Sequence, residues 1–161
     1  MPIPKTKTPL LEIDFQKANS ELEVPGEGMF ERIIAKTLAG VKQKAQLTLR
    51  FVGSEESRCL NYKFRGKNTS TNVLSFPAKN ISHALPDFLG DLVLCVPLVK
   101  KEAVEQGKSE YAHFAHLTVH GVLHLIGYSH SNEVMAEIME SREREILLLF
   151  GFADPYISNS D

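Results

Sequence analysis

Residues 113–130 read HFAHLTVHGVLHLIGYSH and contain five of the six histidines of the chain. An α-helix turns by about 100° per residue, so four of these histidines fall within an arc of about 80°. They are His113, His116, His120 and His124. The pattern predicts a long helix that is capped by Ser109 and ends near Gly127.

The second half of this histidine stripe has the spacing of a metal site. His120 and His124 are four residues apart, so both imidazoles can point at one atom. Gly127 tolerates a positive φ, and a turn at this glycine would bring His130 back to the same point. Three neutral imidazoles plus one open position are typical of a catalytic zinc site. The sequence therefore predicts His120, His124 and His130 as ligands of one Zn²⁺ per chain, a donor set that also accepts nickel or cobalt.

The first half of the stripe is less specific. His116 lies one turn before His120, where it fits either an outer partner or proton shuttle of the site or a histidine packed beside it. His113 lies further from the three ligands, and we expect it at the surface.

A peptidase is disfavoured by one residue. The spacing HxxxHxxGxxH matches the metzincin metalloproteases, in which a glutamate after the first histidine acts as general base. Gly121 stands at that position and has no side chain that accepts a proton. A water activated by the metal remains as the attacking group.

The rest of the chain predicts a mixed sheet surrounded by helices. Apolar and polar residues alternate at 11–15 and 47–51, and β-prone runs follow at 71–76 and 91–96, with a loop at 78–90 between them. Helical spacing recurs at 29–38, at 54–64 after a Ser54 cap, from Pro97, and from Ser131 or Asn132 to 149. Because the helix at 29–38 separates the first two strands, we expect those strands to be parallel. The fold class is α+β, with a four-stranded sheet and a zincin-like metal site on a C-terminal helix.

The chain of 161 residues suggests a single domain, which we place at 10–152 between a flexible arm at 1–9 and a flexible tail at 153–161. A net charge of −2 argues against a wholly basic nucleic-acid or membrane coat. Cys59 and Cys95 are far apart and are expected to be reduced core residues. No apolar run is long enough to span a membrane, and the N-terminus lacks a signal core, so a cytoplasmic location is expected.

Three stretches resemble the YbeY family of bacterial endoribonucleases. HGVLHLIGYSH, from His120 to His130, resembles the family signature HGxLHLxGYDH, with Ser129 where the family usually has Asp. LNYKFRGKNTSTNVLSFP, at 60–77, resembles a family segment that ends in TDVLSFP, with Asn72 in place of Asp. Gly90-Asp91 matches a family GD pair. The resemblance covers about residues 47–150, and a carboxylate missing at 129 is expected to tune the support of a metal-bound imidazole.

The resemblance implies a single-strand-specific, metal-dependent endoribonuclease in 16S rRNA 3′-end maturation and ribosome quality control. The implied partners are rRNA and the small ribosomal subunit with its proteins, without a membrane or a small-molecule cofactor. By motif, His120, His124 and His130 become the metal ligands and Arg65 faces the active cleft. The alternative from another class is a non-catalytic, metal-stabilised ribosome assembly factor.

A phosphodiester substrate also needs cations. A guanidinium makes bidentate contacts to phosphate, so Arg65 is expected to bind and activate the substrate, with His116 as a second catalytic candidate. Lys63 and Lys67 flank Arg65 and are candidates for substrate binding, although a solvated helix end also explains them. The nearly neutral charge predicts weak binding to free RNA, steered by a small basic cleft.

Overall fold

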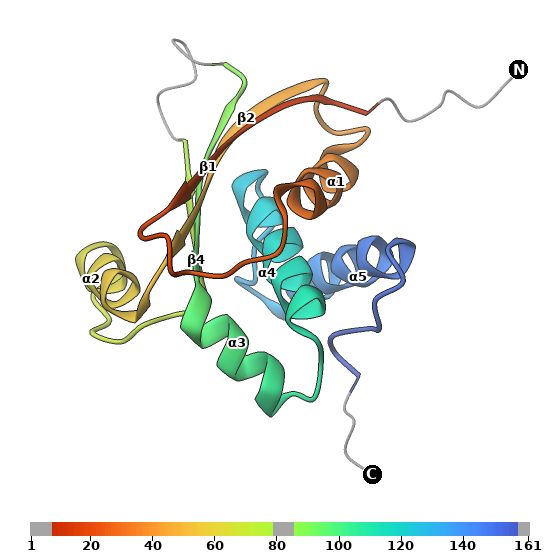
Figure 1. The fold of residues 1–161 in the computed structure, drawn as a ribbon. Coiled ribbons are helices and arrows are strands. Elements are labelled where there is room, and N and C mark those ends of the chain that lie inside the picture. The colour runs from red at the N-terminus through yellow and green to blue at the C-terminus, as the bar shows by residue number, and fades with distance from the viewer. Residues whose placement is uncertain (1–7, 79–85, 158–161) are drawn as a thin grey trace, which may run out of the picture.

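Nine elements follow one another in residues 8–78 and 86–157, the parts of the chain that the computed structural model describes (Figure 1). The four strands are β1 (Leu10–Lys17), β2 (Lys44–Val52), β3 (Val73–Pro77) and β4 (Phe88–Cys95). The five helices are α1 (Glu27–Leu38), α2 (Ser54–Arg65), α3 (Val96–Glu105), α4 (Glu110–Leu125) and α5 (Glu133–Leu149). The order of these elements is the one that the sequence predicts.

The four strands form one mixed sheet in the order β1-β2-β4-β3. β1 pairs in parallel with β2, and β2 in parallel with β4, whereas the edge strand β3 runs antiparallel to β4. The parallel pairing of β1 and β2 confirms the expectation from the helix between them. The chain is therefore an α+β domain built on a mixed four-stranded sheet, as predicted.

Helices cover the two faces of the sheet unequally. Figure 1 shows α2 alone on one side, with α1 and α4 on the other and α5 beyond them. The main core lies between the sheet and α1 and α4, where the ring of Phe30 lies 5.2 Å from that of Phe51 and 6.1 Å from that of Phe114. Because α4 packs against α1, α3, α5, β3 and β4, the helix that carries the histidines is held on several sides.

Two of the predicted helix caps are present. The side chain of Ser109 accepts a hydrogen bond from the backbone N–H of Ala112 at 3.1 Å, and that of Asn132 accepts one from Met135 at 2.9 Å. The prediction for α2 was wrong: Gly53 occupies the cap position in an extended conformation, and Ser54 is the first helical residue.

Two further expectations were wrong. The loop placed at 78–90 ends earlier, because β4 starts at Phe88 and includes Gly90, a residue type that normally disfavours strands. Residues 79–85 lie outside the described residues. Cys95 is buried as expected, but Cys59 is exposed and is not among the buried residues of α2.

The two predicted ends of the chain are described only in part. Residues 1–7 and 158–161 lie outside the described ranges. In the predicted tail, Asp154 forms an ion pair with Arg144 at 3.1 Å, and the Tyr156 hydroxyl bonds to Glu143 at 2.7 Å. Residues 154–156 therefore lie against α5. None of the helices within 8–78 and 86–157 has the length and apolar character needed to cross a membrane.

Candidate metal centre and adjoining cleft

Three histidines that the sequence singles out converge at the C-terminal end of α4. The ring centroids of His120 and His124 are 4.7 Å apart, and the ring of His130 lies 4.7 Å from the first and 4.8 Å from the second. One ligand atom from each lies within 4.8 Å of the other two. His120 and His124 are half-buried and His130 is exposed, so the group opens to solvent.

A turn at the end of α4 delivers His130. The N–H of Gly127 donates to the carbonyl of His124, and the N–H of Tyr128 donates to that of Leu123 at 3.0 Å. Gly127 has φ 108°, a conformation that a side chain would strain. The side chain of Tyr128 packs on the second core cluster and anchors the turn. The chain therefore doubles back at the glycine, as its position in the sequence predicts.

A buried carboxylate on α5 supports His120, and sequence reasoning did not single it out. Glu143 is fully buried, and its Oε1 accepts a hydrogen bond from Nδ1 of His120 at 2.9 Å. This bond fixes the ring and leaves Nε2 with its lone pair for a metal, a common arrangement around metal-bound histidine. A signal was present: position 143 falls on the buried stripe of α5 that also contains Met139, Ile146 and Leu147.

His116 belongs to the same network. Its Nε2 lies 3.2 Å from Oε1 of Glu143 and 3.3 Å from the hydroxyl of Tyr156, which itself donates to Oε2 of Glu143 at 2.7 Å. Ligand atoms of His116, His120 and Glu143 also lie close enough to hold a metal ion. Because these atoms are engaged in hydrogen bonds with one another, we interpret them as the support of the three-histidine group.

His113 is not at the surface, which corrects the expectation for this residue. Its side chain is almost completely buried, and Nε2 lies 2.8 Å from Oε1 of Glu102 on α3. Asn72 donates to the same carboxylate oxygen at 2.9 Å. The distance of His113 from the ligands predicted exposure, but α4 packs against α3, and the contact with Glu102 buries His113.

The charges at the site favour neutral ligands and an ionised support. Burial and the neighbouring His120 and His130 lower the pKa of His124 to about 4, so this imidazole is neutral at physiological pH. Burial alone would raise the pKa of Glu143, but hydrogen bonds from His116, His120 and Tyr156 lower it to about 2. Metal ligation requires deprotonated imidazoles, so this donor set suits a divalent metal ion.

The structure supplies a reason for the glycine within the motif. A Cβ at Gly121 would lie 2.1 Å from Cδ1 of Leu92, because α4 approaches β4 at this point. The position faces the sheet, so a glutamate there would collide with the core. The argument against a peptidase is therefore steric as well as chemical.

The basic residues lie at the end of α2. Lys63 and Arg65 are in its last turn, Lys67 follows Gly66, and all three side chains are exposed. The positive charge of Arg65 is the last of the influences that lower the pKa of His124. That Arg65 faces the active cleft stays a prediction, while Lys63 extends over the ring of Phe64 at 5.3 Å.

Among the described residues, the side chain of Ser129 forms hydrogen bonds with Ser131 and Met135 and with none of the three ligands. Its hydroxyl lies 3.0 Å from that of Ser131 and 3.6 Å from the sulfur of Met135. Its contacts stabilise the turn before α5, so the expected influence on a metal-bound imidazole acts through the turn.

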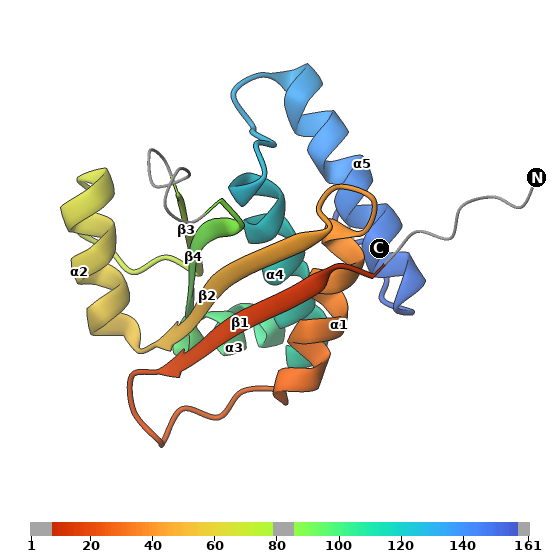
Figure 2. The ribbon, with the colours of Figure 1, turned by 90° about the horizontal axis from the view of Figure 1, so that it is seen from above.

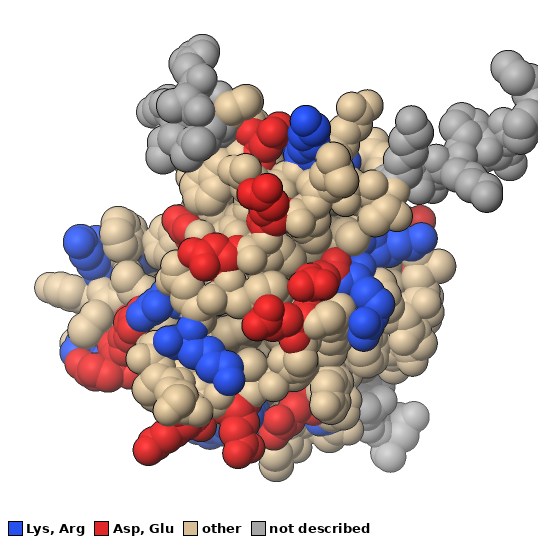
Figure 3. All heavy atoms as spheres, turned by 45° about the horizontal axis from the view of Figure 1, so that its top comes forward, with Lys and Arg blue, Asp and Glu red and all other residues tan. Residues whose placement is uncertain are grey.

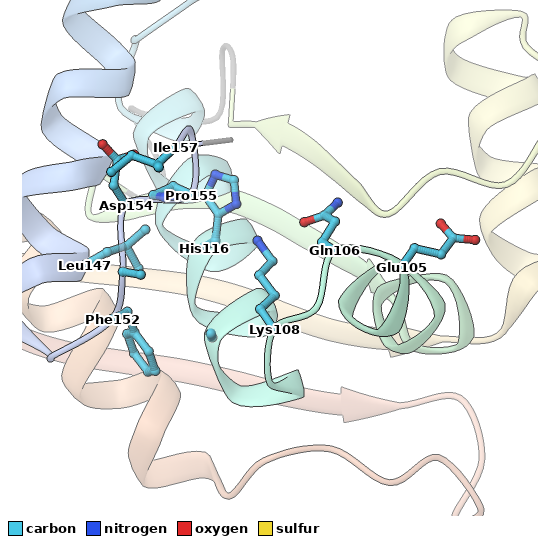
Figure 4. Close-up of a pocket in the computed structure, with 11 residues that line it drawn as sticks. Glu105, Gln106, Lys108, His116, Leu147, Phe152, Asp154, Pro155 and Ile157 are labelled. Atoms are coloured by element: carbon cyan, nitrogen blue, oxygen red, sulfur yellow. The ribbon is translucent and has the colours of Figure 1, made fainter. Parts of the chain in front are cut away.

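A separate cavity of about 590 Å³ lies between the α3–α4 connection and the C-terminal segment (Figure 4). His116 reaches its wall, together with Lys108, Asp154 and Pro155, but the three candidate ligands do not line it. His116 thus lies between this cavity and Glu143.

The surface carries no broad basic area in the view of Figure 3. Acidic side chains are spread over the middle of this face, and Lys and Arg side chains form smaller, separate groups. This distribution agrees with the net charge of −2 and favours local contact with an anionic partner.

Comparisons with known proteins agree with this geometry. The model of the family described as endoribonuclease YbeY matches residues 12–151. The chain is 48% identical over 140 residues to endoribonuclease YbeY of Xylella fastidiosa strain 9a5c, covering 84% of this chain and 86% of that protein. It is 46% identical to endoribonuclease YbeY of Stenotrophomonas maltophilia strain R551-3, covering 91% and 93%. The solution structure of TM1509 from Thermotoga maritima has the same fold, with a TM-score of 0.53 at 23% identity and coverage of 90% and 99%.

Proposed function

Because this chain belongs to the YbeY endoribonuclease family, we propose that it is a zinc-dependent endoribonuclease that cuts single-stranded RNA. One observation carries the proposal: three imidazoles converge on one point, and the group opens to solvent. We further propose that its substrate is rRNA of the small ribosomal subunit, near the 16S 3′ end, and that it acts in ribosome quality control in the cytoplasm. The family resemblance supports these roles.

His120, His124 and His130 would hold the metal. When bound, Zn²⁺ supplies an activated water and stabilises negative charge on the phosphoryl oxygens. Glu143 keeps the ring of His120 fixed through Nδ1, so that this ligand does not have to reorient. Arg65 binds the phosphate bidentately and offsets charge that develops during cleavage.

His116 is placed to donate or accept a proton within the hydrogen-bond network that supports the metal ligands. Its Nε2 faces the Glu143 carboxylate and the Tyr156 hydroxyl, and its ring is mostly buried. His116 therefore acts through Glu143 on the metal ligands. The exposed Lys63 and Lys67 add positive charge that attracts the RNA strand. The single-strand preference fits a small basic edge better than the extended surface that duplex RNA needs.

Cleavage of a labelled single-stranded RNA with the 16S 3′-end sequence tests the proposal. The zinc-loaded wild type is expected to cut it, and a duplex of the same sequence is expected to resist. Arg65→Ala should lower the rate at least about 100-fold, the scale on which loss of one charge-stabilising group acts. Arg32→Ala, an exposed arginine on α1, is the matched control.

The same assay separates the enzyme from an assembly factor. A scaffold stabilised by metal would bind zinc and would not cut RNA at all, with or without Arg65. Cleavage that persists unchanged in Arg65→Ala, or in wild type stripped of metal, would contradict the proposed mechanism.

A further inference from the structure

A pocket of about 460 Å³ lies on the face of the sheet that α2 covers, opposite the face that carries α4. The side chains of Leu60, Phe64, Phe76 and Val93 form its apolar wall. Arg50 and Asp91 are among the polar residues that line it. The established family membership assigns it no role.

An exposed aromatic ring forms the rim of the pocket. Phe64 is 57% exposed although it is a large apolar residue, and its ring lies 5.1 Å from that of Phe76 at an angle of 65°. One edge of the ring is thus supported by β3 while its surface remains accessible. Such rings provide stacking surfaces for the bases of single-stranded nucleic acids.

The polar side of the pocket favours a hydrogen-bond donor over an anion. Arg50 is already held by Glu56 at 2.7 Å and by Gln16 at 3.2 Å. No hydrogen bond or ion pair joins the half-buried Asp91 carboxylate to another residue within 8–78 and 86–157. The free acceptor would repel a phosphate and accept from the amino group of a base, as carboxylates do from nucleobase amines.

The pocket lies close to the candidate centre across β3. Ser75 of this strand donates to the carbonyl of Gly121 on α4 at 3.3 Å, and the next residue, Phe76, lines the pocket. Phe64 precedes Arg65, the arginine proposed to bind the phosphate. The ammonium of Lys63 lies over one face of the Phe64 ring and keeps positive charge at the rim, so a base stacks on the other face. A strand whose phosphate is bound by Arg65 can therefore place a neighbouring base on Phe64, while its backbone stays on the basic side of the pocket.

We propose that this pocket binds one unpaired nucleobase of the RNA substrate, stacked on Phe64 and recognised through an amino group by Asp91. The inference rests on the proposed function and deepens it, because it gives the cleaved strand a second point of attachment. Guanine, which presents two adjacent N–H donors on one edge, is the base that a carboxylate fits best.

Binding by the whole chain tests the pocket independently of cleavage. The probes are a short fluorescein-labelled oligouridylate and the same strand with one guanosine, titrated by fluorescence anisotropy with chelator present to prevent cutting. Wild type is expected to prefer the guanosine strand. Phe64→Ala should weaken this binding about tenfold and Phe64→Tyr should retain it, because stacking needs only an aromatic face. Tyr111→Ala, which removes an equally exposed ring on α4, is the matched control.

Asp91→Asn keeps the shape of the pocket and is expected to abolish the preference for guanosine. Equal binding by Phe64→Ala and Tyr111→Ala would overturn the base pocket, and cleavage that depends on Arg65 would then still support the proposed function. A guanosine preference that survives in Asp91→Asn would overturn recognition by the carboxylate. Binding that requires Phe64, with no cleavage after zinc is restored, would support the pocket and count against the proposed function.

Discussion

Two histidines of α4 each pair with a glutamate from a neighbouring helix, and the two pairs have opposite burial. Near the start of α4, His113 is 3% exposed and its partner Glu102 is 22% exposed, with 2.8 Å between the bonded atoms. Near the end, His120 is 21% exposed and its partner Glu143 is 0% exposed, at 2.9 Å. In the first pair, the partly exposed carboxylate of Glu102 bonds to the buried ring of His113. In the second, the buried carboxylate of Glu143 bonds to the partly exposed ring of His120. Only the second arrangement offers a ligand to solvent.

The largest expected effect separates the two ends of α4. His124→Ala is expected to remove more than about 90% of the bound zinc, because two remaining imidazoles hold the metal weakly. His113→Ala is expected to keep the metal and to lower stability by about 2 kcal/mol, since it leaves a cavity and removes one of the hydrogen-bond partners of Glu102. Metal content by plasma mass spectrometry and urea unfolding measure the two effects. Equal loss of zinc from both variants would show that metal binding does not distinguish His124 from His113.

The next effect concerns the two carboxylates. Glu143→Gln is expected to lower zinc affinity about 10- to 100-fold, because the neutral amide holds the ring of His120 less firmly. Glu102→Gln, the matched change in the other pair, should alter it less than about twofold, because His113 lies outside the three-histidine group. Competition with a chromophoric chelator measures both affinities. A similar loss in the two variants would mean that general stability, not ring orientation, controls the metal.

The sequence predicted the histidines of this comparison better than their carboxylates. Helical spacing and Gly127 place His120, His124 and His130 together because they are local in the chain. Glu143 is 23 residues from His120 and Glu102 is 11 from His113, so their pairing depends on how α5 and α3 pack on α4. The spacing of residues along one helix does not indicate which neighbouring helices pack against it.

Contacts between elements distant in the sequence were also missed in the fold and at the second pocket. Alternation, β-prone runs and helical spacing located the four strands and five helices described in 8–78 and 86–157, and the helix between β1 and β2 predicted their parallel pairing. The burial of His113 and the start of β4 at Phe88 were missed because contact with α3 and pairing with β2 override local signals. Phe64 and Asp91 share a wall although 27 positions separate them, which required the sheet itself.

The pH dependence of folding stability tests a property that the two halves of α4 share, which is a lowered histidine pKa. Burial lowers the pKa of His113, and burial with neighbouring imidazoles lowers that of His124 to about 4. Unfolded histidine titrates near about 6.5, so between about pH 6.5 and pH 4 the unfolded chain binds more protons and folding is weakened as pH falls. Glu143 stays ionised in this window, because its pKa is about 2.

For the metal-free protein we expect a loss of about 1 kcal/mol between pH 7 and pH 5 from the half-buried His124, after screening by solvent. Urea unfolding at both pH values measures it, with His124→Gln expected to lose that part of the dependence. Stability that is flat or higher at pH 5 in the wild type would contradict the assignment of neutral, buried imidazoles.

The smallest expected effect on zinc affinity tests the support that the second pair receives from the C-terminal segment. The Tyr156 hydroxyl donates to Oε2 of Glu143, while His116 and His120 both face Oε1. Tyr156→Phe keeps the ring and removes one donor from a buried, charged acceptor, which should cost about 1–2 kcal/mol of stability. Because His120 keeps its own bond, zinc affinity should fall only about threefold. Tyr111→Phe is the control. Unchanged zinc affinity and stability in Tyr156→Phe would mean that Glu143 orients His120 without support from the segment after α5.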